Sequence, residues 1–320
     1  MKAAVYYNTG GPEVFRYEDV PDPQCHPRGV LVETQAVSIE GGDVLNRAGG
    51  EMAGSPHVVG YQGAGVIREV GGQVTDRQVG QHVVTIGPFG SHAALRSVPV
   101  RSTWLVPDGL AIEAAACVPI PFGTADDCLF EFGRLQAGET VLIQGGGGGV
   151  GLAAIQLAKR HGARVLATAS SDAKLERLRP FGMDEGINYR DGDLVREVMR
   201  LTEGKGCDVV VDPVGGDVLQ QSLACLAYRG RAITVGNASR GARLLDVSSL
   251  GGGNRSLTGV YLGAEMASDR VYDMIRRHIA DVAKGELTVV IDRTFPLAAA
   301  ADAHAYIESR QAVGRVVLVP

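Results

Sequence analysis

The sequence predicts an α/β protein that combines a doubly wound parallel Rossmann sheet with a second, β-rich domain. Segment 141–171, VLIQGGGGGVGLAAIQLAKRHGARVLATASS, has the pattern of a strand, a glycine turn, an amphipathic helix and a second strand. Strand-like and helix-like segments alternate over 140–260, which is typical of a parallel sheet with helical crossovers. Short strand-like segments separated by Gly, Pro and Asp fill the first hundred residues and indicate the β-rich domain.

The strands of the β-rich domain are predicted from short apolar runs that end at turn residues. These runs are 3–7, 30–37, 65–70, 82–86 and 91–98. A Val-Pro-Asp-Gly turn follows at 106–109, and the apolar residues of 112–118 indicate the start of a helix.

The parallel sheet and the C-terminal tail follow in order. The sheet is predicted to contain strands at 141–143, 165–169, 185–188, 208–212, 231–235 and 256–260. The tail is predicted to contain a helix at 269–284, a strand at 288–295, a helix at 297–309 and a strand at 315–319. The last strand needs a sheet to join, and the N-terminal β region is the natural one.

The glycine run after the first parallel strand carries the strongest functional signal. The segment from Gly146 to Gly151 satisfies G-x-G-x-x-G directly after the apolar run 141–143. Glycines there permit a tight turn and let the backbone approach a pyrophosphate, while the helix N-terminus offers unpaired N–H groups to the phosphates. A glycine-rich linker can match the same motif by accident, but the strand–turn–helix–strand context favours a dinucleotide site.

The end of the second parallel strand predicts which dinucleotide binds. NAD sites usually carry an Asp or Glu there, whereas this chain has Ser170 and Ser171, with Lys174 shortly after. Hydroxyl groups and a cation suit a 2′-phosphate, which a carboxylate would repel. The nearest acid, Asp172, falls at the start of the next helix, where carboxylates are favoured anyway. Ordinary N-capping by the serines is the alternative interpretation, and we predict NADP(H) rather than NAD(H).

Composition and charge argue against several classes of protein. The net charge is −5, aromatic residues make up 5% of the chain and no basic run occurs, so nucleic-acid binding is not expected. No segment has the apolar length of a membrane span, and the first residues lack a signal-peptide pattern. The five cysteines are scattered without C-x-x-C spacing, and the seven histidines lack H-E-x-x-H spacing. We therefore expect a cytoplasmic protein without a disulfide framework.

Motifs in order along nearly the whole chain resemble those of a known family. They are GGPEVF, LVPDGL, LQAGETVLIQGGGGGVGLAAIQLAKRHGARVLATASSDAKL, GINYRDGD, VDPVGGDVL, VGNAS and the terminal GRVVLVP. With them the chain resembles the zinc-independent quinone oxidoreductases related to zeta-crystallin, within the medium-chain dehydrogenase/reductase superfamily. The resemblance implies a GroES-like catalytic domain over 1–122, completed by a C-terminal return over 265–320. It also implies an NADP-binding Rossmann domain over 123–264, with cofactor and substrate in the cleft between the domains.

The resemblance implies a set of cofactor-binding residues as well. In the motif that begins at Gly146, the pyrophosphate would meet Gly148, Gly149, Val150 and Gly151; the 2′-phosphate would lie among Ser170, Ser171, Lys174 and Tyr189; and Val214, Gly236, Asn237 and Leu262 would lie toward the nicotinamide, with Thr124 at the domain junction. For Tyr189, a half-exposed tyrosine at a strand end is the alternative interpretation.

The segments that hold zinc in metal-dependent relatives are different here. Those relatives carry a cysteine in the first loop, a G-H-E motif and a four-cysteine lobe, whereas this chain has SIEGGD at 38–43, GYQ at 60–62 and no cysteine in 87–100. Because a zinc site needs several ligands at fixed spacing, we expect no metal. Without a Lewis acid, the expected substrates are acceptors that delocalise incoming charge themselves, namely quinones and α,β-unsaturated carbonyls (enones), reduced with NADPH.

Three side chains are candidates for catalysis. Tyr61 is the best phenolic proton donor, with a packing tyrosine as the alternative. Glu40 would act as a proton donor if burial raised its pKa, but the base rate favours a loop carboxylate pointing into solvent. Asp43 is expected to form an ion pair with Arg47 that holds the loop together. Asp126, where relatives usually carry an aromatic residue, would make the pocket more polar.

Two alternative functions stay open at this stage. One is an NADP-linked reductase of a specialised enone or acyl thioester, which a cationic patch should accompany; Arg47, Arg240 and Arg243 are the arginines considered for it. The other is an NADPH-binding protein without significant turnover, of the crystallin or RNA-binding type. The resemblance also implies a homodimer joined along the apolar edge segment 256–260, and two-fold dimers are the commonest soluble oligomers.

Overall fold

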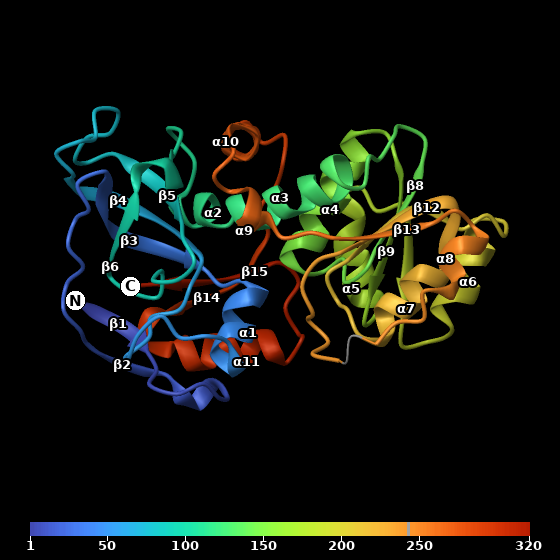
Figure 1. The fold of residues 1–320 in the computed structure, drawn as a ribbon, viewed down its shortest axis with the longest axis horizontal. Helices are drawn as coiled ribbons and strands as arrows, with labels where there is room; N and C mark the ends of the chain where they lie inside the picture. Colours follow the sequence, from blue (N-terminus) through green and yellow to red (C-terminus); the bar gives the residue numbers. More distant parts are fainter. Residues whose placement is uncertain (242–243) are drawn as a thin grey trace. The chain divides into compact units, whose positions relative to one another are not determined.

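The structure, a computed structural model, describes residues 1–241 and 244–320. These residues form two compact units, Met1–Ile120 with Tyr272–Pro320, and Pro121–Val271 (Figure 1). The first unit is rich in antiparallel strands, and the second contains a parallel sheet with intervening helices. The predicted fold class is therefore confirmed.

A seven-stranded sheet organises the β-rich unit. Its strands pair in the order β14 (Ile291–Pro296), β15 (Arg315–Val319), β3 (Gly29–Ser38), β4 (Gln62–Val70), β5 (His82–Ile86) and β7 (Thr103–Leu105), and β6 (Leu95–Pro99) also pairs with β3. The terminal strand β15 lies antiparallel to β3, with Val317 opposite Ser38. This pairing confirms that the last strand joins the N-terminal sheet. A separate antiparallel pair joins β1 (Lys2–Val5) and β2 (Arg16–Asp19).

The helices of this unit cover its apolar surfaces. They include α1 (Gly41–Gly49), α2 (Ile112–Ala116) and α11 (Ala300–Glu308), with α3 (Pro119–Asp126) and α10 (Asp269–Ala283) at the two places where the chain leaves and re-enters the unit. Ala303 of α11 packs in one buried cluster with Val37 of β3 and Val316 of β15. Burial of these side chains fastens the C-terminal segment to the N-terminal sheet.

The six strands of the second unit run parallel. Their order is β10 (Glu185–Asn188), β9 (Arg164–Ala169), β8 (Thr140–Ile143), β11 (Cys207–Asp212), β12 (Leu226–Thr234) and β13 (Ser256–Gly259). Counted from β8, this is the strand order of a Rossmann fold, in which ligands bind beyond the carboxyl ends of the strands where the order reverses. The reversal here falls between β8 and β11.

Helices connect the parallel strands and bury their apolar side chains. The connections include α4 (Gly149–Arg160), α5 (Asp172–Leu178), α6 (Leu194–Leu201) and α7 (Asp217–Ala224), followed by the short α8 (Ser248–Gly252) and α9 (Leu262–Glu265). Leu142 and Val210 of the sheet pack with Val198 of α6 and Leu223 of α7 in one fully buried cluster. Figure 1 shows the strands passing between these helices.

Several predicted boundaries differ from those observed. The strand predicted at 91–98 begins only at Leu95, because the backbone N–H groups of Ser91 and His92 bond to the carbonyls of Gly60 and Val59 outside the strand ladder. The predicted helix 297–309 begins with a 3₁₀ turn, Leu297–Ala299. The strand β2, with the polar sequence RYED, was not predicted, since it lacks apolar alternation and is defined only by its pairing with β1.

Two buried histidines lie against each other in the β-rich unit. Nε2 of His92 lies 3.1 Å from Nε2 of His304 on α11, and both side chains are fully buried. The ring of Phe15 contacts His304 edge-on at 4.7 Å. Burial lowers the pKa of His92 to about 3 and lowers the pKa of His304 well below its usual value. Both rings are therefore neutral in the folded protein at neutral pH.

Replacement of His304 with glutamine should change how stability depends on pH. In the unfolded chain each histidine gains a proton below about pH 6.5, whereas the folded chain keeps the pair neutral. The wild type therefore loses about 1.4 kcal/mol per pH unit and per histidine below that pH. His304→Gln lacks its share of this loss, so its stability deficit relative to the wild type should shrink on acidification from pH 7.5 to 5.

Urea unfolding of both proteins across this pH range measures the effect. The raised pKa values of buried carboxyls, which act in the opposite direction, cancel in the difference. His82→Gln, at an exposed position on β5, is the matched control for removal of a histidine outside the buried pair. A His304→Gln deficit that stays constant with pH would contradict a neutral buried pair.

Candidate functional site

The glycine turn after β8 forms a cradle in which Gly146 and Gly151 leave no room for a side chain. Gly145 has a φ of 62°, and a Cβ atom at Gly151 would lie 2.5 Å from the Gly145 carbonyl oxygen. A Cβ atom at Gly146 would meet Ala167 of β9 at 3.0 Å and Leu178 of α5 at 2.9 Å, so this glycine lets the turn pack on the sheet. Because these positions carry no side chain, the turn packs closely on the sheet and a ligand can approach its backbone.

The N-terminus of α4 is left open by this turn. Gly148 is the N-cap, none of the side chains that the structure describes caps the helix, and α4 begins with Gly149, Val150 and Gly151. The first N–H groups of a helix lack intrahelical partners and carry the positive end of its dipole. The arrangement fits a pyrophosphate, and Gly146, Gly148, Gly149, Val150 and Gly151 would hold it.

The residues predicted for the 2′-phosphate follow two neighbouring strands. Ser170 comes directly after β9 and Tyr189 directly after β10, and Asn188 of β10 lies opposite Ala169 of β9. The Tyr189 N–H bonds to the Ala169 carbonyl at 3.1 Å, and its side chain is 42% exposed. The structure thus brings these residues to one corner of the sheet.

One of the two serines also caps a helix, as the alternative interpretation expected. Ser171 is the N-cap of α5, and its hydroxyl accepts the N–H of Lys174 at 3.4 Å. The cap also fixes Lys174 in the first turn of α5. Asp172 begins α5, as expected, and its carboxylate accepts the side-chain amide of Asn188 at 3.3 Å.

The remaining cofactor candidates also follow strand ends, with one exception. Val214 follows β11, Gly236 and Asn237 follow β12, and Leu262 follows β13. The loops after β11 and β12 are bonded together, because the Ser239 N–H bonds to the Val214 carbonyl at 2.8 Å. The exception is Thr124, which lies buried in α3.

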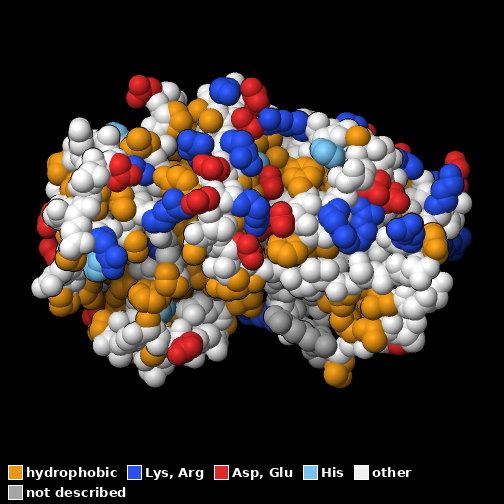
Figure 2. Space-filling view, turned by 45° about the horizontal axis from the view of Figure 1, so that its top comes forward, with side chains coloured by type: hydrophobic (Ala, Val, Ile, Leu, Met, Phe, Trp, Pro, Cys, Tyr) orange, Lys and Arg blue, Asp and Glu red, His pale blue; other side chains and the backbone are white. Residues whose placement is uncertain are grey.

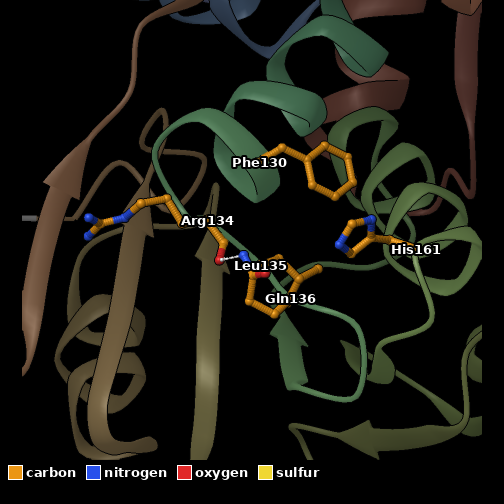
Figure 3. Close-up of a pocket in the computed structure, with 5 residues that line it drawn as sticks. All are labelled: Phe130, Arg134, Leu135, Gln136 and His161. Atoms are coloured by element: carbon orange, nitrogen blue, oxygen red, sulfur yellow. Dashed lines mark hydrogen bonds between the residues drawn. The ribbon is translucent and has the colours of Figure 1, made fainter.

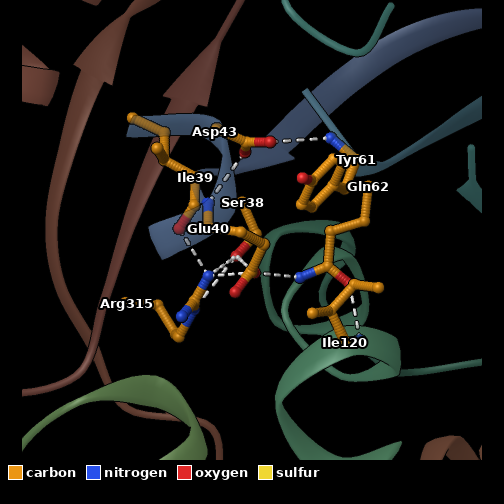
Figure 4. Close-up of polar contacts among 8 residues, drawn as sticks. All are labelled: Ser38, Ile39, Glu40, Asp43, Tyr61, Gln62, Ile120 and Arg315. Carbon is orange, nitrogen blue, oxygen red and sulfur yellow. Dashed lines mark hydrogen bonds and ion pairs between the residues drawn. The ribbon is translucent and has the colours of Figure 1, made fainter. Parts of the chain in front are cut away.

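Glu40 is buried in a network of polar side chains in the β-rich unit (Figure 4). One carboxylate oxygen accepts the side-chain amide of Gln62 at 2.5 Å and also contacts the guanidinium of Arg315. Burial raises the pKa of Glu40 to about 7, against the opposing effects of Arg315, Gln62 and Ser38. The expectation of a carboxylate pointing into solvent was wrong, because Arg315 and Gln62 replace the lost hydration.

Asp43 also lies in this network, and it supports the backbone. One of its oxygens accepts the N–H of Glu40 at 2.8 Å and the other accepts the N–H of Tyr61 at 3.1 Å. Burial raises the pKa of Asp43 to about 8. The predicted ion pair with Arg47 was wrong: Arg47 is fully buried and pairs with Glu308 of α11 at 2.5 Å.

The backbone and the ring of Tyr61 both contact neighbouring residues. Besides Asp43 at its N–H, its carbonyl accepts the Gly87 N–H at 2.8 Å and the buried guanidinium of Arg96 at 2.9 Å. Its ring lies over Gly42, where a Cβ atom would come within 2.9 Å of the phenolic oxygen. Arg96, Arg315 and Gln62 were not predicted as site residues. An arginine or glutamine inside an apolar strand pattern is the signal that marks them.

A surface pocket in the second unit lies near the amino ends of the parallel strands (Figure 3). It has a volume of about 380 Å³ and is lined by Phe130, Arg134, Leu135, Gln136 and His161. Phe130 belongs to a π-helix, Asp127–Glu131, and its ring lies 5.0 Å from that of His161. These residues precede β8 and β9, so the pocket lies at the amino ends of the strands and not among the turns described above.

Comparison with known proteins agrees with this geometry. Residues 26–108 match the family model described as alcohol dehydrogenase GroES-like domain, and residues 149–281 match the model described as zinc-binding dehydrogenase. A quinone oxidoreductase of Pseudomonas aeruginosa is 35% identical over 97% of both chains. A 2-haloacrylate reductase of Burkholderia sp. is 35% identical over 100% of this chain and 99% of its own. The crystal structure of Escherichia coli quinone oxidoreductase complexed with NADPH matches with a TM-score of 0.94 at 27% identity, over 100% of both chains.

The chain belongs to the zinc-independent quinone oxidoreductase branch of the medium-chain dehydrogenase/reductase superfamily. As a member of this branch it is an oxidoreductase. Although one matching model is described as zinc-binding, Glu40 and Tyr61 stand in the segments that hold zinc ligands in the metal-dependent members. Across residues 1–241 and 244–320, no group of three or more His, Cys, Asp or Glu side chains is placed to hold a metal ion.

The surface of this oxidoreductase mixes both signs of charge. On the face drawn in Figure 2, Lys and Arg side chains lie beside Asp and Glu side chains. Arg270, for example, lies 3.8 Å from Glu131 and 3.4 Å from Glu265. In the described part of the chain, none of the helices combines the length and the apolar character needed to cross a membrane.

Proposed function

We propose that this protein is an NADPH-dependent, zinc-independent reductase of quinones or α,β-unsaturated carbonyls. The observation that carries the proposal is the glycine cradle after β8, followed at the end of β9 by Ser170 and Lys174 in place of a carboxylate. The cradle suits a pyrophosphate, and the hydroxyl and ammonium groups suit a 2′-phosphate. When bound, the cofactor supplies a hydride to the conjugated acceptor.

The residues proposed to hold the cofactor divide into three groups. Gly146, Gly148, Gly149, Val150 and Gly151 bind the pyrophosphate; Ser170, Ser171, Lys174 and Tyr189 bind the 2′-phosphate; and Thr124, Val214, Gly236, Asn237 and Leu262 bind toward the nicotinamide. All but Thr124 lie in turns or helix starts that follow carboxyl ends of parallel strands, where ligands of this fold bind.

We assign different roles to the three catalytic candidates. Tyr61 is the proposed proton donor to the oxygen of the reduced acceptor. Its ring lies over Gly42, and its backbone N–H and carbonyl are both hydrogen-bonded. Asp43 acts as a positioning residue, since both of its oxygens are occupied by backbone N–H groups. Glu40, with a pKa raised to about 7, is a second proton source held by Arg315.

Replacement of Lys174 with alanine should weaken NADPH binding and leave NADH binding unchanged. A hydrogen bond to a charged phosphate contributes about 1.5–3 kcal/mol, so the Kd for NADPH should rise about 10- to 100-fold. NADH lacks the 2′-phosphate and should bind both proteins equally. Fluorescence titration with each nucleotide measures the two constants.

Lys205→Ala is the matched control for this variant. Lys205 is an exposed lysine of the same unit and lies 3.7 Å from Glu203, so its removal should leave both constants unchanged. If Lys174→Ala instead weakened both nucleotides equally, or neither, the 2′-phosphate assignment would fail.

One of the three arginines considered for an acyl-thioester site does not lie on the surface. Arg47 is buried against Glu308 and contributes nothing to a surface patch. Arg240 is exposed, and Arg243 lies outside the described residues. We therefore favour simple quinones and enones as substrates, and turnover only with a thioester would reverse this choice.

A homodimer is proposed along β13, which lies at one edge of the parallel sheet. An edge strand offers unpaired backbone groups to a second copy of the same strand. Light scattering should give twice the chain mass of 33.6 kDa. A mass of one chain would contradict the dimer.

We also propose that the protein works in the cytoplasm. All five cysteines are free, and four of them are buried: Cys117, Cys128, Cys207 and Cys225. Free cysteines are usual in a reducing compartment. Cell fractionation that placed the protein outside the cytoplasm would contradict this location.

A further inference from the structure

A buried chain of hydrogen bonds runs beneath the glycine turn. The N–H of Gly145 donates to the Thr168 hydroxyl at 2.9 Å, and this hydroxyl donates to the side-chain oxygen of Gln144 at 2.9 Å. The Gln144 amide donates to the Ser222 hydroxyl at 3.1 Å, which donates to the Asp212 carboxylate at 2.8 Å. We call Thr168, Gln144, Ser222 and Asp212 the polar relay.

The polar relay links two of the loops proposed to bind the cofactor. At one end, Thr168 holds two successive N–H groups of the glycine turn, that of Gly145 with its hydroxyl and that of Gly146 with its carbonyl at 2.8 Å. At the other end, one oxygen of Asp212 accepts the N–H groups of Val214 at 2.8 Å and Gly215 at 2.9 Å. A Cβ atom on Gly215 would lie 2.6 Å from the side-chain oxygen of Asn237, so the loop after β12 is packed on the same support.

Burial and donor direction make the relay a single unit. Gln144 and Thr168 are each 1% exposed, and Asp212 and Ser222 are fully buried. The chain begins at an N–H group, which can only donate, and ends at a carboxylate, which accepts. Each hydroxyl between them accepts one hydrogen bond and donates the next, so the direction of every bond is fixed. Removal of one member leaves its neighbours without a partner in a place that water does not reach.

We propose that the polar relay positions the glycine turn and the loop after β11 for binding of NADPH. The inference rests on the proposed cofactor and adds the residues that set the geometry of its site without touching it. Gly145, at a φ of 62°, keeps its N–H directed at Thr168. Without the relay the turn would still be possible for glycine, but its N–H groups would lose their fixed direction.

Thr168→Val and Ser222→Ala test the relay, because each removes one hydroxyl with little change in shape. We expect each variant to raise the Kd for NADPH, measured by fluorescence titration, about tenfold. Because both hydroxyls belong to one chain of bonds, their effects should not add. The Kd of the double variant for NADPH should be no higher than that of the single variant with the higher Kd.

Thr202→Val provides a matched control in the same unit. The buried Thr202 hydroxyl also accepts a glycine N–H, that of Gly206 at 2.9 Å, and donates to the Val198 carbonyl. Urea unfolding should show a stability loss for this variant similar to that of Thr168→Val. Its Kd for NADPH should equal that of the wild type.

The outcomes separate this inference from the proposed function. If Thr168→Val loses stability as the control does but binds NADPH like the wild type, the relay is only structural and the inference is overturned. Effects that add in the double variant would overturn it as well, since the hydroxyls would then act independently. Failure of the wild type to bind NADPH would instead reject the proposed cofactor.

Discussion

Replacement of Gly148 with alanine should raise the Kd for NADPH about 100-fold, or ~2.7 kcal/mol, without unfolding the protein. Gly148 has a φ of −79°, which alanine adopts freely, and the nearest atom to an added Cβ is the Gly145 carbonyl oxygen at 3.4 Å, an ordinary contact. The protein therefore tolerates the methyl group. The loss must come from the cofactor, whose pyrophosphate can no longer approach the N-terminus of α4.

Alanine variants of two further glycines serve as comparisons for Gly148→Ala. At Gly192 an added Cβ meets no atom within 4 Å, so Gly192→Ala should bind NADPH like the wild type. At Gly151 the Cβ would lie 2.8 Å from the Gly146 Cα atom, so Gly151→Ala should lose both stability and binding. Calorimetry and thermal unfolding measure the two properties. Unchanged NADPH affinity in Gly148→Ala would place the pyrophosphate elsewhere.

Replacement of Arg315 with methionine should lower the free energy of unfolding by about 3–5 kcal/mol, the usual cost of removing one partner of a buried ion pair. Arg315 contacts the Glu40 carboxylate and donates to the Ser38 hydroxyl at 2.8 Å and the Ile39 carbonyl at 2.6 Å. Its loss leaves these acceptors buried without their strongest donor. Urea unfolding at pH 8, where Glu40 is mostly ionised, measures the loss.

A double-mutant cycle isolates the charge on Glu40. In a Glu40→Gln background the same Arg315→Met change leaves no unpaired carboxylate at position 40, so it should cost clearly less than in the wild type. Arg293→Met, at an exposed arginine on the neighbouring strand β14, should cost little. An equal cost of Arg315→Met with and without Glu40 would show that the ion pair does not stabilise the unit.

The placement of the residues proposed for the cofactor could be predicted from sequence because their signals are local. The glycine turn, the serines after β9 and Tyr189 after β10 all follow apolar strand patterns, and parallel strands bring their carboxyl ends together. The polar relay is harder to predict. Thr168, Gln144 and Asp212 are visible only as polar residues near strand ends, and Ser222 comes from a helix.

The environment of Glu40 could not be predicted because its partner is distant in sequence. Arg315 lies 275 residues away and reaches Glu40 only because β15 pairs with β3. The predicted Asp43–Arg47 pair followed the local spacing of a helix. The fold instead uses Asp43 for two backbone N–H groups and supplies Glu308, 261 residues from Arg47, as the partner.

Oxidation of NADPH by a panel of quinones and enones, followed by absorbance, tests the central claim most directly. NADH is measured in parallel, with enzyme-free controls because quinones accept hydride unaided. We predict turnover with NADPH well above that with NADH, for at least one conjugated acceptor. No turnover with any acceptor, despite demonstrated NADPH binding, would contradict the proposed reaction.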